Sequence, residues 1–138
     1  MKVDSKVLNR FLDKVTIGGD GIRDGIVDFT DEGLKINVLD ETNTVFIIGN
    51  LKKSVFKDYK PLGKVAVANF TMLKNVTSRY SEEVEITINE NVLCFKTKNR
   101  EFEVVLPDVE TVTQSRNEPT LEYVNSFKLS TSFLKEAV

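Results

Sequence analysis

Apolar and polar residues alternate with a period of two over much of the chain, and the clearest example lies in its first third. Two alternating stretches, at residues 26–29 and 34–38, are followed there by a wholly apolar one at residues 45–48. Two short polar segments, residues 31–33 and 40–43, separate them. β-Branched and aromatic residues at period two, bounded by Asp, Asn and Gly, are typical of strands and of the turns between them. The pattern therefore predicts a three-stranded antiparallel meander.

A period of three to four residues precedes this region and predicts an amphipathic helix. Asp4 or Ser5 is placed to cap its N-terminus, and Gly18 with Gly19 to end it. At about 100° per residue, the apolar and polar positions separate onto opposite faces. The apolar stripe consists of Val7, Leu8, Phe11, Leu12 and Val15. The polar face consists of Lys6, Asn9, Arg10 and Asp13, with Lys14 on its flank.

A second helix is predicted to begin after Asn69, whose side chain is typical of an N-cap. A short helical turn within residues 52–59 and a short strand at residues 65–67 precede it. Its expected buried side consists of Met72, Leu73, Val76 and Tyr80. Its expected polar side consists of Thr71, Lys74, Asn75 and Ser78, with Arg79 at the edge.

A second meander follows the second helix, because residues 83–88, 92–97 and 102–106 alternate again. Two meanders and two amphipathic helices indicate the α+β class. We expect antiparallel sheets on one side, with the two helices packed on the other.

The chain then turns polar over residues 107–120, which is typical of a linker. Residues 121–129 read as extended, and Ser130 is placed to cap another helix. This ending repeats the beginning, since residues 1–12 align with residues 127–138 and Asp4 matches Ser130. The repeat predicts that a second copy of the domain begins after the linker, and hence that the chain is the first domain of a longer protein or a truncated product.

The composition excludes several classes of site. The chain has 138 residues, a formal net charge of −2 and no histidine, which removes Ser–His and Cys–His nucleophiles and most zinc sites. Its single cysteine, Cys94, lies in an apolar stretch, where a buried thiol is the expected role. Asp31 with Glu32 and Asp40 with Glu41 are paired carboxylates, but both pairs fall in predicted turns. We expect no enzyme activity, no catalytic residue, no metal site and no cofactor.

The expected location is intracellular, cytoplasmic or, in a eukaryote, nuclear. A single cysteine cannot form an internal disulfide, which favours a reducing compartment. The sequence has no apolar run long enough to cross a bilayer, and its N-terminus lacks the pattern of a secretory signal. We therefore expect no membrane partner. The mildly acidic charge is unlike that of domains that are basic overall, but it is compatible with a local basic face.

Four segments carry a family resemblance: GLKINVLDETNTVFI (33–47), VFKDY (55–59), NFTMLKNV (69–76) and VVLPDVE (104–110). With these segments and with the predicted order of helices and strands, the sequence resembles the sliding clamps of the proliferating cell nuclear antigen family, of archaeal, eukaryotic or viral type. The resemblance implies three parts. Residues 1–106 correspond to a first clamp domain, residues 107–120 to the interdomain connecting loop, and residues 121–138 to the opening strand and helix of a second domain.

The resemblance implies a DNA sliding clamp, a processivity factor for DNA polymerase that encircles duplex DNA and tethers replication and repair enzymes. In such a ring, the helices line the hole and contact phosphates without regard to sequence. The residues that would face DNA are Lys6, Arg10, Lys14, Lys74 and Arg79. Taken without the resemblance, the same residues are the solvated faces of two amphipathic helices.

The resemblance also implies a pocket for short peptides of DNA polymerase, the clamp loader and other clamp-binding proteins. Leu39, Thr44 and Phe46 would line it from the sheet, and Val112 from the loop. The linker looks longer than is usual in the family and carries Thr111, Thr113 and Gln114 where apolar residues are expected. The family completes the pocket from a second domain, so we expect weak peptide binding by these residues alone.

We expect the full-length protein to form a ring trimer, which this chain without a second domain would not close. Two alternatives stay open. One is a protein-interaction module of the same fold that does not encircle DNA, such as a checkpoint-type or viral relative. The other is a subunit of an unrelated α+β enzyme, which the missing histidine disfavours.

Overall fold

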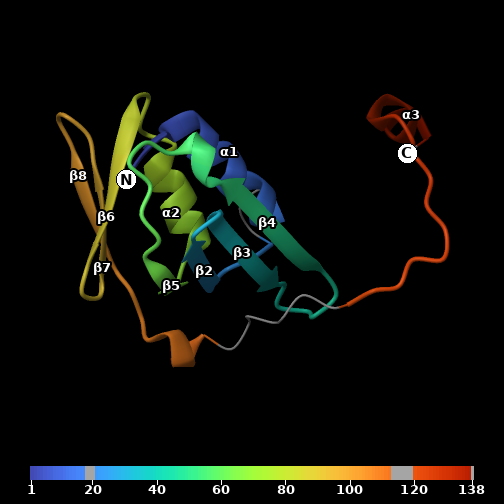
Figure 1. The fold of residues 1–138 in the computed structure, drawn as a ribbon, viewed down its shortest axis with the longest axis horizontal. Helices are drawn as coiled ribbons and strands as arrows, with labels where there is room; N and C mark the ends of the chain where they lie inside the picture. Colours follow the sequence, from blue (N-terminus) through green and yellow to red (C-terminus); the bar gives the residue numbers. More distant parts are fainter. Residues whose placement is uncertain (18–20, 113–119, 138) are drawn as a thin grey trace.

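The computed structural model describes residues 1–17, 21–112 and 120–137. Two antiparallel sheets and the helices α1 and α2 form the main body, while α3 lies apart from it in Figure 1. The elements in chain order are β1 (Lys2–Asp4), α1 (Ser5–Val15), β2 (Gly25–Thr30), β3 (Gly33–Leu39), β4 (Phe46–Lys52), η2 (Lys53–Val55), β5 (Gly63–Val67), α2 (Phe70–Thr77), β6 (Glu83–Asn89), β7 (Val92–Lys96), β8 (Glu101–Val105), η3 (Val109–Thr111) and α3 (Thr131–Ala137).

Each sheet contains one of the predicted meanders. The strand order is β4-β3-β2-β5 in one sheet and β1-β6-β7-β8 in the other, and neighbouring strands run antiparallel. The first meander pairs Val27 with Ile36, and the second pairs Leu93 with Val104. Figure 1 shows α1 and α2 side by side, with strands of the two sheets on either side of them. The α+β class and both antiparallel meanders are thereby confirmed.

The core lies where the helices meet the sheets. α1 buries Leu8, Leu12 and Val15, and the strands bury their inward positions, such as Phe29 and Ile36. An apolar space of about 30 Å³ lies among side chains from both helices and both sheets. Because this space matches a single water molecule in size, it belongs to the core and is no ligand site.

α1 packs closely over the edge strand β4, and Gly49 permits the approach. A Cβ atom at this position would lie 2.5 Å from Val15 Cγ1 and 3.1 Å from the Phe11 ring. β4 extends beyond the predicted strand at residues 45–48, reaching Lys52. The helical turn predicted within residues 52–59 is the single 3-10 turn η2.

The N-terminal cap of α1 is Asp4, whose carboxylate accepts from the Lys6 N–H at 2.7 Å. Ser5, the other candidate, is buried inside the first turn, where its hydroxyl donates to the Tyr80 carbonyl at 3.0 Å. The helix ends at Val15, and the backbone N–H of Thr16 bonds back to the last turn. Gly18 and Gly19, the predicted stop, lie outside the described residues.

The predicted cap of α2 is confirmed, because Asn69 Oδ1 accepts from the Met72 N–H at 2.8 Å. The predicted buried stripe is partly wrong. Met72 is 39% exposed, whereas Phe70, Leu73 and Thr77 are buried. Phe70 opens the helix and enters the core, so at about 100° per residue positions 73 and 77 follow it inward and position 72 turns outward.

The opening strand predicted within residues 121–129 does not form in the described part of the chain. A strand is held by hydrogen bonds to a neighbouring strand, and no described strand pairs with this stretch. Its apolar side chains are largely exposed, Val124 and Phe127 by more than 80%. The predicted cap of the following helix is present, since Ser130 Oγ accepts from the Phe133 N–H at 3.2 Å.

Within residues 1–17, 21–112 and 120–137, no helix combines the length and apolar character needed to cross a membrane.

Candidate nucleic-acid interface

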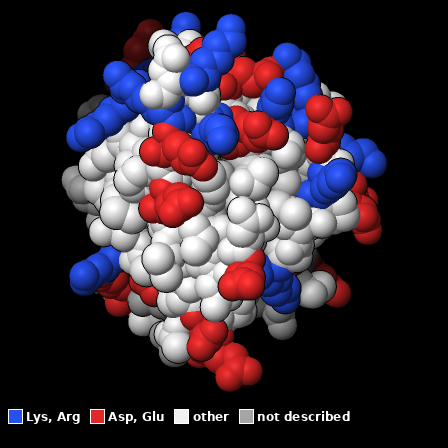
Figure 2. Space-filling model, turned by 90° about the vertical axis from the view of Figure 1, so that its left-hand side faces the viewer, with Lys and Arg blue, Asp and Glu red and all other residues white. Residues whose placement is uncertain are grey.

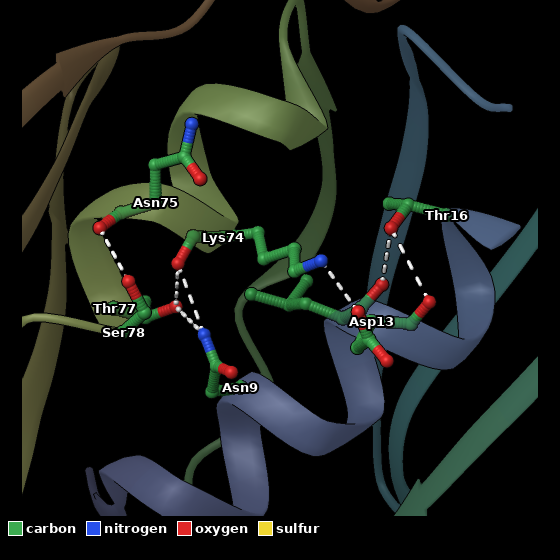
Figure 3. Close-up of polar contacts among 8 residues, drawn as sticks. Asn9, Asp13, Thr16, Lys74, Asn75, Thr77 and Ser78 are labelled. Atoms are coloured by element: carbon green, nitrogen blue, oxygen red, sulfur yellow. Dashed lines mark hydrogen bonds and ion pairs between the residues drawn. The ribbon is translucent and has the colours of Figure 1, made fainter. Parts of the chain in front are cut away.

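A polar network forms the contact between α1 and α2 (Figure 3). Asn9 Nδ2 donates to the backbone carbonyl of Lys74 at 3.0 Å and to Thr77 Oγ1 at 3.3 Å. Thr77 also donates to the Lys74 carbonyl, at 3.0 Å. Because the Asn9 amide reaches the backbone of the facing helix, it fixes the spacing and register of the pair.

The side chain of Lys74 crosses from α2 to α1 and pairs with Asp13 (Figure 3). Lys74 Nζ lies 2.5 Å from Asp13 Oδ1, and the exposed fractions of the two side chains are 21% and 50%. Periodicity assigned Asn9 and Asp13 to the outward face, but both lie on the flank that faces α2. Their spacing of four residues on one helix was the available signal for such a flank.

Three of the predicted DNA-facing residues, Lys6, Arg10 and Lys14, are exposed on α1. Each lies four positions after the one before it, so successive side chains are rotated by only about 40° and form one stripe. Arg10 and Lys14 also line a groove of about 400 Å³ between α1 and β4, together with apolar residues such as Phe11. α1 therefore presents a continuous line of positive charge.

α2 presents less positive charge. Its outward positions carry Met72, Asn75 and, at the C-cap, Ser78, which are uncharged. Arg79, the predicted DNA-facing residue beyond the helix end, is exposed. Lys74 is the remaining predicted cation on this helix, and its ammonium is neutralised by Asp13.

The side of the molecule that carries β6, β7 and β8 shows basic and acidic side chains interspersed (Figure 2). Ion pairs account for part of this mixing: Lys57 pairs with Glu83, and Lys96 Nζ lies 3.7 Å from a Glu101 carboxylate oxygen. Phosphate binding needs a surplus of positive charge. This side is therefore a poorer candidate for DNA contact than the α1 stripe.

The residues predicted to line a peptide pocket differ in burial. Leu39 and Val112 are buried, Phe46 is half-buried and Thr44 is exposed. Leu39 and Phe46 are register partners at the end of the β3–β4 ladder. Val112 lines a hollow of about 560 Å³ together with Arg23, Asp24, Glu41, Ala68, Pro107 and Thr111. Leu39, Thr44 and Phe46 do not line this hollow, and Thr113 and Gln114 lie outside the described residues.

Asp40 organises the turn between Leu39 and Phe46. Its carboxylate accepts from the backbone N–H groups of Thr44 and Val45, each at 2.7 Å, and from the Thr42 hydroxyl. The hydrogen bond from Thr42, with those from the backbone, lowers the pKa of Asp40 well below its usual range. Asp40 is therefore a structural anion of the turn, as sequence reasoning predicted for this carboxylate.

Cys94 is buried in β7, as predicted. Its thiol donates to a Glu101 carboxylate oxygen at 3.2 Å. Burial, and then the neighbouring carboxylate, raise the pKa of the Cys94 thiol. A raised pKa keeps the thiol protonated at neutral pH, which makes it a poor nucleophile.

The two meanders, the two side-by-side helices and their order along the chain define a sliding-clamp fold. Solved structures of similar fold bear this out. Proliferating cell nuclear antigen of A. fulgidus, in a structure with the C-terminal region of FEN-1 bound, matches with a TM-score of 0.74 and 18% identity, over 88% of this chain and 50% of that one. The protein of the same name from Entamoeba histolytica matches with a TM-score of 0.69 and 15% identity, over 88% of this chain and 51% of that one.

The chain thus spans about half the length of the solved clamps that it matches. No family model matches its sequence, and no curated protein matches it either. At 15–18% identity, the likeness establishes the fold alone.

Proposed function

We propose that this chain belongs to a DNA sliding clamp, in which α1 and α2 face duplex DNA and the protein has no catalytic activity of its own. The observation that carries the proposal is the exposed stripe of Lys6, Arg10 and Lys14 on α1 of a sliding-clamp fold. Contacts between such side chains and phosphates are sequence-independent and individually weak. Weak contacts suit a ring, because enclosure holds the DNA while the protein slides.

Ring assembly requires sheet edges that accept another strand. β8 and β4 are edge strands of their sheets, and Val105 on β8 is 75% exposed. An unpaired edge offers backbone N–H and C=O groups to an incoming strand. We propose that β8 pairs with a neighbouring subunit, and that the complete protein forms a ring trimer.

We further propose that the clamp tethers replication and repair enzymes through short peptides. The A. fulgidus clamp with the C-terminal region of FEN-1 supports this mode of binding. In this chain, the candidate contacts are Leu39, Thr44 and Phe46 at the end of the β3–β4 ladder, with Val112 on the connecting segment. The apolar anchors of a peptide would supply most of the binding energy.

A second candidate is a clamp-fold module that binds proteins and does not encircle DNA. The neutralisation of Lys74 by Asp13 and the net charge of −2 favour it, because both weaken the positive field of the helix layer. The two candidates differ in topology, since only a closed ring distinguishes circular from linear DNA.

Retention on DNA tests the proposal. The complete protein is assembled on nicked circular DNA, and the same DNA is then cut once. We expect retention at salt concentrations that abolish direct phosphate contacts, followed by rapid loss after the cut. Equal loss from circular and linear DNA would contradict encirclement and favour the interaction module.

A further inference from the structure

The ion pair between Asp13 and Lys74 lies within the layer that carries the proposed DNA contacts. From its geometry we propose that Asp13 is a positioning residue that withholds the Lys74 ammonium from DNA phosphates and so limits the affinity of the helix layer for DNA. This inference rests on the proposed function, in which α1 and α2 face duplex DNA. The inference gives the Asp13 carboxylate a functional role, namely to weaken DNA binding.

The geometry places Lys74 under the control of Asp13. The 2.5 Å separation of Lys74 Nζ and Asp13 Oδ1 is that of direct contact. Only 21% of the Lys74 side chain is exposed, so solvent screens this ammonium less than it would a freely exposed one. A phosphate that approached Lys74 would have to displace the Asp13 carboxylate, which belongs to the neighbouring helix and stays in place.

The ion pair is not needed to hold α1 and α2 together. Asn9 already joins α1 to the α2 backbone through the Lys74 carbonyl and Thr77 Oγ1. Ion pairs that are half exposed on one side contribute little to stability. The main consequence of Asp13 is therefore electrostatic: it cancels one positive charge beside the α1 stripe.

The expected effect follows from counterion release. Each additional phosphate contact steepens the dependence of the logarithm of affinity on the logarithm of salt concentration by about 0.9. Asp13→Asn keeps the shape of the side chain and removes the carboxylate that pairs with Lys74. We expect this variant to bind duplex DNA about threefold to tenfold more tightly at low salt and to gain one such increment of slope.

The experiment titrates a duplex oligonucleotide into the protein at several salt concentrations, with affinity and salt slope as the readouts. The variants are Asp13→Asn, Asp13→Glu, Lys74→Gln and the double variant Asp13→Asn/Lys74→Gln. Asp31→Asn, in the turn between β2 and β3, removes the same charge away from Lys74 and is the matched control. We expect the gain in Asp13→Asn alone, and wild-type behaviour in Asp13→Glu and Asp31→Asn.

The outcomes separate the inference from the proposed function. A gain that persists in the double variant, whose net charge equals that of the wild type, would show that Lys74 does not mediate it. A gain that Asp31→Asn reproduces would assign the effect to net charge, and either result would overturn the inference. If Lys6→Gln and Arg10→Gln weaken binding while Asp13→Asn changes nothing, the inference fails and the proposed function stands. If none of the variants changes DNA binding, the proposed function fails with it.

Discussion

α1 and α2 lie side by side, yet they present different surfaces. α1 exposes a stripe of three cations, Lys6, Arg10 and Lys14. α2 exposes mainly uncharged side chains, and the ammonium of its own lysine, Lys74, pairs with Asp13 of α1. The contact between the helices thus determines which positive charges are available.

The difference shows that a count of basic residues overstates the positive field of a surface. Five cations were assigned to the helix layer from the sequence, but the structure offsets one of them within the layer. Charge that is neutralised at short range contributes little to the attraction of a distant phosphate. The comparison therefore predicts that α1 dominates DNA binding and that the contribution of α2 is small.

The largest expected effect comes from removing the α1 stripe. Replacing Lys6, Arg10 and Lys14 together with Gln would remove the three proposed phosphate contacts, each of which is expected to contribute about 0.9 to the salt slope. We expect an affinity loss on the order of a hundredfold at low salt, measured by fluorescence anisotropy with a duplex oligonucleotide. The matched control replaces Lys35, Lys52 and Lys64 with Gln, which makes the same charge change on the sheet of β2 to β5. An equal loss in the control would show that net charge, and not the stripe, governs binding.

The contact between the helices is tested by Asn9→Ala. This change removes the hydrogen bonds from Asn9 to the Lys74 carbonyl and to Thr77 Oγ1. Because Thr77 is buried, water does not readily replace the lost donor. We expect the free energy of unfolding to fall by about 1–2 kcal/mol, measured by urea denaturation. Asn75→Ala, at an outward position of α2, should change it by less than about 0.5 kcal/mol. Equal effects at the two positions would show that Asn9 does not specifically stabilise the contact between α1 and α2.

The smallest expected effect separates the two cations of the α2 region. Arg79→Gln should lower DNA affinity about threefold and reduce the salt slope by about 0.9, because Arg79 is exposed. Lys74→Gln should leave the salt slope nearly unchanged, because the paired ammonium makes no phosphate contact, and should lower affinity less than Arg79→Gln, through the Asp13 carboxylate that it leaves unpaired. The same anisotropy titration measures both variants. A larger loss for Lys74→Gln than for Arg79→Gln would reverse the proposed ranking.

The sequence was sufficient to predict the two three-stranded meanders, because alternation reports directly which strand positions face the core, but not the addition of β1 and β5 to the two sheets. Val27 and Ile36 were both assigned to strands by this signal, and they are paired and buried. The helix caps were also predictable, because Asp4 and Asn69 accept hydrogen bonds from N–H groups no more than three residues away. Signals of this kind depend only on residues close in sequence, so they can be recognised before the tertiary structure is known.

The lateral faces of the helices were not predictable in this way. Periodicity separates the core side of a helix from the opposite side, but it does not say which neighbour lies along a flank. Asn9 and Asp13 were read as solvated for this reason, although both face α2. Met72 was misplaced because the choice of the buried stripe depended on Phe70, which opens the helix inside the core. The pocket residues depend on still more distant contacts, and their common role remains a proposal.

The most direct test of the account is to map the DNA-contacting surface by NMR. Duplex DNA is titrated into isotope-labelled protein at low salt, and backbone and side-chain resonances are followed residue by residue. The account predicts the largest shifts at Lys6, Arg10 and Lys14, a smaller one at Arg79, and little change at Lys74 or on β6 to β8. Shifts centred on the strands, with α1 unaffected, would contradict it.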